Sequence, residues 1–241
     1  MRLLFLFTLS FIISTSFAQD LKSNELEQVQ KDSVTTVVYS KYREDQFYAS
    51  VSYVLMQGKP SGYSQNSFST GLSVGFLRDM PINKNRTYAI AAGLGYSYYN
   101  IKHNLKVSEN AGTKIYEQVS TLDFDKNKLV LHYLELPIEF RWRNSTAESH
   151  KFWRIYTGFK VSYLLRNKAQ FYALDGADIR VTNNRGLNKL VYGAYVAAGW
   201  NTWNLYVYYG LTPIYEKEAR LSGGQEINLN AVNFGVMFYI L

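Results

Sequence analysis

From residue 46 onward, apolar residues alternate with small or polar ones at a period of two. In one run, for example, Tyr96 and Tyr98 alternate with Gly95 and Ser97. A period of two is typical of half-buried β-strands and not of helices. The pattern predicts eight strands, over residues 47–55, 68–76, 88–98, 130–142, 153–165, 190–200, 203–211 and 232–240.

The two faces of these strands differ in chemistry. The 46 positions of the more apolar face include no Asp, Glu, Lys or Arg, and His132 is their only titratable residue besides tyrosines. The other face is rich in Gly, Ala and Ser, which suit a narrow interior better than a water-facing surface. We therefore expect the apolar face to contact lipid. Because hydrocarbon offers no partner to an open sheet edge, the predicted fold is all-β: a closed antiparallel eight-stranded up-and-down transmembrane β-barrel.

Loop lengths agree with this topology. The first, third, fifth and seventh connections are long, and the others are mostly shorter. Outer-membrane barrels have long outer loops and short periplasmic turns, so both termini are expected in the periplasm. Aromatic residues near strand ends are expected to form interfacial girdles. They are Tyr53, Tyr88, Tyr98, Trp142, Trp153, Trp200 and Trp203.

The N-terminal region differs from the rest of the chain. Residues 1–18 combine a positive start, a short apolar run and small residues at Ser16 and Ala18, which predicts a cleaved signal peptide. An anchor helix is the alternative, but the apolar run is short for a membrane span. Residues 19–45 are a polar tail, either solvated or in contact with a partner, and residues 46–241 form the barrel. We expect an exported integral protein of the outer membrane.

Composition excludes several functions. The chain has 241 residues, no Cys, three His and a formal net charge of +7. Without Cys there is no disulfide framework or thiolate metal site. His103, His132 and His150 lack ligand spacing, and Asp175 and Asp178 lack the spacing of a calcium loop, so we expect neither a metal nor another cofactor. No Ser-His-acid arrangement is visible from spacing, and we expect no enzyme activity.

Charged residues also occur on the inward face of two neighbouring strands. They are Glu135, Glu139, Arg141, Arg154 and Lys160. A pair of carboxylates can act as general acid and base. An eight-stranded lumen is only wide enough to be filled by side chains, so an ion-paired plug is the favoured interpretation.

Most of the excess positive charge lies at strand ends and in loops. The residues concerned are Arg78, Lys84, Arg86, Lys102, Lys106, Arg143, Lys168, Arg180 and Arg185. Those at the outer rim are candidates for pairing with lipopolysaccharide phosphates, and outer-membrane lipid is the expected surrounding. Nucleic acid is not expected as a partner in this compartment.

The segment from His132 to Arg143, with its Tyr-Leu-Glu-Leu-Pro core, resembles the PorT-like or "porin family" outer-membrane barrels of type IX-secreting Gram-negative bacteria. The resemblance also covers the strand from Lys151 to Tyr163 and extends over the barrel. It implies a non-enzymatic accessory or structural role linked to protein export by type IX secretion, with other envelope proteins as partners. The alternatives are a surface-binding or structural barrel whose loops contact lipopolysaccharide, glycan or other cells, and a small-solute channel, which a filled lumen disfavours.

Overall fold

A computed structural model describes residues 45–65, 67–144 and 152–240. The chain divides into two units, Met1–Ser40 and Lys41–Leu241, and the described residues all lie in the second. The signal peptide and all but the last residue of the polar tail lie outside them. No helix in the described ranges is long and apolar enough to cross a membrane.

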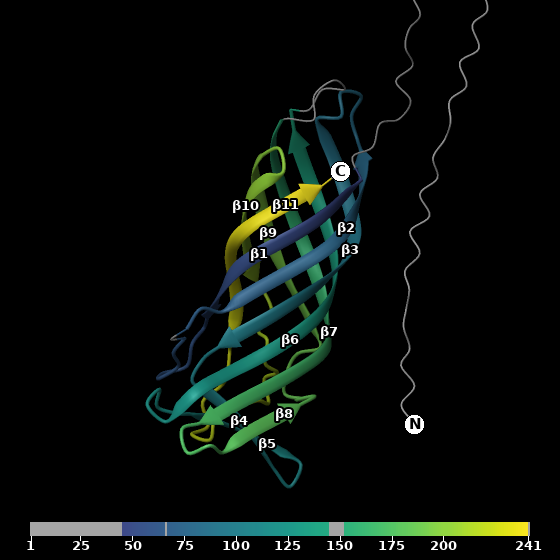
Figure 1. Cartoon of the computed structure of the whole chain (residues 1–241). Helices are drawn as coiled ribbons and strands as arrows, with labels where there is room; N and C mark the ends of the chain where they lie inside the picture. The colour runs from purple at the N-terminus through teal and green to yellow at the C-terminus, as the bar shows by residue number, and fades with distance from the viewer. Residues whose placement is uncertain (1–44, 66, 145–151, 241) are drawn as a thin grey trace, which may run out of the picture. The chain divides into compact units, whose positions relative to one another are not determined.

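The second unit is a closed barrel of eight antiparallel strands (Figure 1). They are β1 (Gln46–Gln57), β2 (Thr70–Pro81), β3 (Tyr88–Lys102), β6 (Phe124–Arg143), β7 (Trp153–Ala173), β9 (Leu190–Trp200), β10 (Trp203–Gly210) and β11 (Asn230–Ile240). Each strand pairs with its neighbour in the chain, and β1 pairs with β11 from Phe47–Ile240 to Gln57–Asn230. The predicted fold class is confirmed.

The two strand faces separate as the alternation predicts. Large apolar side chains of the outward face are exposed, among them Phe47 at 62%, Trp203 at 66% and Leu205 at 73%. Some inward positions hold glycine beside a large side chain: a Cβ added to Gly95 would clash with the Tyr48 hydroxyl. An apolar belt of this extent is typical of a surface covered by lipid.

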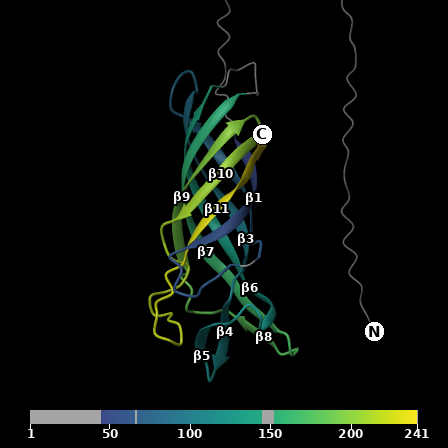
Figure 2. The same cartoon turned by 90° about the vertical axis from the view of Figure 1, so that its left-hand side faces the viewer.

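The two ends of the barrel differ. At one end, named here the turn end, β2 leads to β3, β6 to β7 and β9 to β10. At the opposite loop end, the third and fifth connections contain β-structure: β4 (Leu105–Asn110), β5 (Thr113–Gln118) and β8 (Asp178–Thr182). Figure 2 shows these three strands gathered at the loop end. The sequence predicted long loops at residues 100–128 and 166–189. In the structure β6 begins within the first of these loops, β7 ends within the second, and β8 in the second loop pairs with β7.

A β-bulge explains why the alternation gave no signal beyond Leu165. The β6–β7 register shifts between His132–Arg166 and Tyr133–Leu164. The extra residue reverses the inward and outward positions of the following part of β7, which a simple period of two cannot reveal. Beyond the bulge, Asn167 and Ala169 are buried.

The long connections fold over the barrel mouth around an apolar core. Buried residues of the barrel wall, such as Ile101 and Leu131, form one cluster with Leu105, Leu187 and Leu229 of the connections. Toward the turn end, a second cluster contains tyrosines, including Tyr48, Tyr156 and Tyr239. The interior is therefore packed at both levels.

Candidate functional site

The interior charges predicted from sequence lie together. Glu135, Glu139 and Arg141 come from β6, whereas Arg154 and Lys160 come from its neighbour β7. All five point inward and are at most 3% exposed. Their spacing at even intervals along adjacent strands is what places them on one face.

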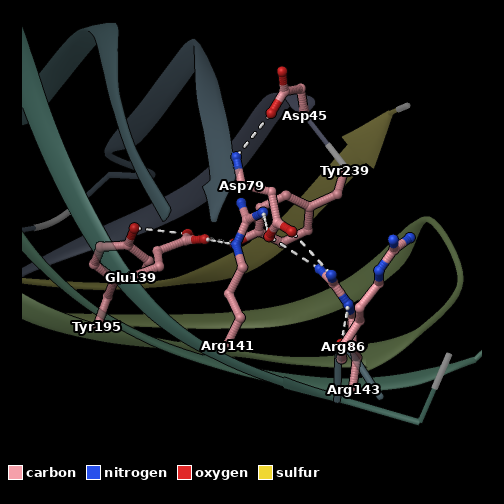
Figure 3. A network of polar contacts seen from close by, with 8 residues as sticks. All are labelled: Asp45, Asp79, Arg86, Glu139, Arg141, Arg143, Tyr195 and Tyr239. Carbon is pink, nitrogen blue, oxygen red and sulfur yellow. Dashed lines mark hydrogen bonds and ion pairs between the residues drawn. The ribbon is translucent and has the colours of Figure 1, made fainter. Parts of the chain in front are cut away.

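Toward the turn end, Arg141 lies between two acids (Figure 3). Its Nη1 is 2.8 Å from Asp79 Oδ1, and its Nε is 2.8 Å from Glu139 Oε2. Arg143 Nη2 is 2.9 Å from Asp79 Oδ2. The hydroxyls of Tyr195 and Tyr239 each donate to Glu139 Oε1 at 2.8 Å. These charge-assisted hydrogen bonds offset the cost of removing the ions from water.

A second ion pair lies further toward the loop end. Lys160 Nζ is 2.9 Å from Glu135 Oε1, which also accepts a hydrogen bond from the Ser97 hydroxyl at 2.7 Å. The Lys160 ammonium also lies over the Tyr208 ring, 4.8 Å from its centroid. The Tyr208 ring thus stabilises the buried ammonium group through a cation–π contact.

Arg154 belongs to the predicted interior group but forms no ion pair with an acid in the described part of the chain. Arg154 lies opposite Arg143 in the β6–β7 register, and its guanidinium packs 4.5 Å from the Phe152 ring centroid. Its Nε and Nη1 have no hydrogen-bond partner in the described part of the chain. The cross-strand neighbour of Arg154 is a cation, so aromatic faces take the place of a carboxylate.

Sequence reasoning missed Asp79 and placed Arg143 among the cations at strand ends and in loops. Arg143 does end β6, but its side chain and that of Asp79 are fully buried in the network. The alternation of inward and outward positions could have predicted both residues. Asp79 continues the inward series of β2 two residues beyond Leu77, and Arg143 likewise continues the series of β6 beyond Arg141. At the edge of the network, Asp45 of the expected tail accepts a hydrogen bond from the Asp79 backbone N–H at 2.9 Å.

The interior is filled rather than hollow. A cavity of about 20 Å³ lies among Tyr99, Tyr133 and Tyr208, and this volume holds about one water molecule. Both oxygens of the Glu139 carboxylate and Oε1 of Glu135 are held by cations and hydroxyls, whereas Glu135 Oε2 is buried without a hydrogen-bond partner in the described residues. The two acids thus lie within a buried ion-paired network, as an ion-paired plug requires.

The aromatic residues expected at the membrane interfaces lie at two levels. Tyr53 and Tyr98 lie near the loop end, where the Tyr53 ring stacks on Phe68 at 4.8 Å and the Tyr98 ring meets His132 edge-on at 5.3 Å. The other five lie near the turn end: Tyr88 pairs with Trp142, and Trp200 pairs with both Trp153 and Trp203.

The folded connections at the loop end form a platform, defined here as residues 103–123, 174–189 and 211–229. Asparagine side chains tie its parts together, because Asn188 Nδ2 donates to the carbonyl oxygens of Pro213 and Tyr215 at 2.8 and 2.9 Å. The Tyr116 hydroxyl donates to Asn184 Oδ1 at 2.9 Å. An open groove of about 620 Å³ runs between Glu117–Val119 and Leu221–Gln225. These contacts favour a fixed surface.

The closed sheet, the apolar belt on its outer surface and the packed interior are typical of one class of protein, the outer-membrane β-barrels. The family described as outer membrane protein beta-barrel domain matches residues 17–216, and the chain belongs to this family. The protein is accordingly an outer-membrane protein. A comparison with curated proteins finds no significant match.

Solved structures similar to this chain are also barrels. Ail, the attachment invasion locus protein of Yersinia pestis, crystallised with the heparin analogue sucrose octasulfate, is 12% identical. The match has a TM-score of 0.39 and covers 82% of this chain and 97% of Ail. A triple mutant of the Rhodopseudomonas blastica porin is 8% identical, with a TM-score of 0.21 and coverage of 83% and 100%. Likenesses of this size carry no inference about ligand or activity.

Replacing Glu139 by Leu is expected to destabilise the barrel. The change leaves Arg141 with one acid instead of two and leaves the Tyr195 and Tyr239 hydroxyls without their acceptor. Removing one member of a buried network costs about 3–5 kcal/mol. The midpoint of thermal unfolding in detergent, followed by heat-modifiable gel mobility, should therefore fall. In the control variant Glu226→Leu, which breaks an exposed pair with Arg220, the midpoint should barely move. Equal midpoints for both variants would contradict the plug.

The loop end should lose stability in acid through His103. Burial lowers the pKa of His103 from 6.5 to about 4, and its Nδ1 accepts a hydrogen bond from the Leu105 backbone N–H at 2.9 Å. Below pH 6.5 the unfolded chain takes up a proton that folded His103 does not, so stability falls by roughly 3 kcal/mol as the pH drops toward 4. His103→Asn keeps an acceptor that cannot be protonated there. The unfolding midpoint of this variant should depend less on pH between 6.5 and 4.5, and an unchanged pH profile would show that His103 is not responsible.

Proposed function

We propose that this protein is a non-conducting, non-enzymatic outer-membrane barrel that presents the platform at the cell surface as a binding surface. The observation that carries the proposal is the contrast between a filled lumen and a folded loop end. Transport needs an open path, whereas the ion-pair plug and the apolar core of the platform occupy the space in which one would run.

The platform has the features of a recognition surface. Its apolar core and cross-loop asparagine bonds fix the backbone, so ordering it on binding costs little conformational entropy. Its groove has polar residues such as Gln118 and Gln225 beside Tyr116 and Leu221. This mixture suits polar ligands such as glycans or the surfaces of envelope components.

The orientation belongs to the same proposal. Long loops face outward in outer-membrane barrels, so the platform is extracellular and the turn end is periplasmic. The absence of enzyme activity is also proposed. In the described part of the chain, His103 Nδ1 accepts a hydrogen bond from the Leu105 backbone N–H, and His132 pairs with the Tyr96 hydroxyl on the outward face. Ser67 and Asp125 line one pocket with His103, but within the described residues neither forms a hydrogen bond or ion pair with it, as a Ser-His-acid arrangement would need.

The export role implied by the resemblance to PorT-like barrels stays a prediction. The tail expected to serve it, residues 19–45, lies almost wholly outside the described ranges. The amount of type IX cargo in the medium of a deletion strain, with a plasmid-restored control, separates the two roles. Loss and restoration of secretion would favour export over a surface-binding role.

Cysteine labelling tests the presentation of the platform directly, because the natural chain has no Cys. Gly223 lies in the platform and has open space around its Cα, and Lys84 lies in the β2–β3 turn. On intact cells a membrane-impermeant maleimide should label Gly223→Cys and leave Lys84→Cys unlabelled. Both should react after lysis. Labelling of Lys84→Cys but not Gly223→Cys on intact cells would reverse the orientation and contradict the proposal.

A further inference from the structure

The outward wall of the barrel carries an uneven distribution of positive charge. Strands β9, β10, β11 and β1 contain no Lys or Arg. On the other side, β3, β6, β7 and β8 lie side by side toward the loop end (Figure 1). Six outward-facing cations on these four strands form what we call the basic stripe: Lys102, Lys126, Lys128, Arg166, Lys168 and Arg180.

The strand register places these cations close together. Lys102 lies directly opposite Lys128, which lies opposite Gln170, and Gln170 in turn lies opposite Arg180. Neighbouring strands are about 4.8 Å apart, so this row brings three cations within about three strand spacings. The bulge contributes as well, because the reversal after Leu165 turns Arg166 and Lys168 outward.

Within the described residues, acids lie close to only part of this charge: Asp125 lines a pocket with Lys102 and Lys126, and Asp178 lies beside Arg180. The one ion pair of the stripe joins Arg180 to Asp178 at 4.0 Å, where both side chains are largely exposed. Like charges directly opposite one another, as in Lys102 and Lys128, destabilise a sheet. An anion bound between Lys102 and Lys128 would relieve this repulsion.

The position of the stripe on the wall indicates which anion. The stripe begins at the aromatic level of Tyr98 and His132, where Arg166 lies directly opposite His132, and it faces sideways, on the same surface as the apolar belt below it. A ligand held there has its polar part at the height of the lipid headgroups and its apolar part against the belt. Phosphate is the anionic group that headgroups present at this level, and lysine and arginine bind it well.

We propose that the basic stripe binds the phosphorylated headgroup of an outer-leaflet lipid, one that carries more than one phosphate. Lys102 and Lys128 hold one phosphate, and Arg166 with Lys168 holds another, nearer the belt. Four rows separate Lys128 from Arg166, about 13 Å along the strand, and Lys168 lies midway between them. A headgroup with two phosphates spans this row of cations better than a single phosphate does. The inference rests on the proposed outward orientation of the loop end.

The test measures lipid binding to the full chain in detergent micelles by native mass spectrometry and by titration. The probes are diphosphoryl lipid A, monophosphoryl lipid A, phosphatidylglycerol, inorganic phosphate and heparin. The stripe variant combines Lys102→Gln, Lys128→Gln and Lys168→Gln. A matched control combines Lys59→Gln, Lys189→Gln and Lys217→Gln, which removes the same charge from exposed loop-end positions off the stripe.

The native chain and the control should bind diphosphoryl lipid A equally and more tightly than the monophosphoryl form, with an affinity that falls as salt is added. The stripe variant should bind it at least about tenfold more weakly. Because the substitutions remove like-charge repulsion, the unfolding midpoint of the stripe variant without lipid should be equal to or above that of the native chain. A misfolded variant is thereby told apart from one that has lost a site.

Several results would overturn the inference. Equal binding by the stripe variant and the native chain would remove the site. Saturation by inorganic phosphate alone would make it a simple anion site, and a preference for heparin over lipid would assign it to a soluble polyanion. In each case an outward platform in the cysteine labelling would leave the proposed function standing. Labelling from the periplasmic side would instead overturn both.

Discussion

The backbone ladder between β1 and β11 is the contact on which the rest of the structure depends. It pairs the first barrel strand with the last over eleven residue pairs and so leaves the barrel without a sheet edge. In hydrocarbon an unpaired edge would cost several kcal/mol for each backbone group. Closure with eight strands then fixes the interior as a space that side chains can fill.

The chemistry of the interior follows from the difference between the two faces of each strand. Because the outward face contacts lipid, charged side chains must lie inward or at the strand ends. The turn end uses ion pairs such as Arg141–Asp79, and aromatic rings of Phe152, Tyr156 and Tyr239 pack on Arg154, which has no carboxylate partner in the described residues. Toward the loop end the filling becomes apolar, because the connections supply Leu187 and Leu229 and cover the mouth. Because the lumen is sealed in two chemically different ways, we propose that function resides at the outer surface rather than in the interior.

The barrel strands and most of their inward-facing residues could be predicted from the sequence, because an alternation with a period of two is visible within each strand by itself. The alternation predicted the eight barrel strands and the inward direction of Glu135 and Lys160. It failed where the signal is not local. The bulge at His132–Tyr133 hides the second half of β7, and Asp79 lies beyond the point at which the pattern was followed. The platform could not be predicted, because contacts such as Tyr116 with Leu221 join residues far apart in the chain and leave no periodic trace.

The central claim is that this barrel is sealed and acts through its outer surface. The most direct measurement is the current through a planar lipid bilayer into which the purified full chain has been inserted, with insertion verified by heat-modifiable mobility of the recovered protein. The account predicts a current no greater than that of the bare bilayer over the whole range of applied voltage. Reproducible stepwise conductance from the native chain would show an open path through the ion pairs and the platform core, and would contradict it.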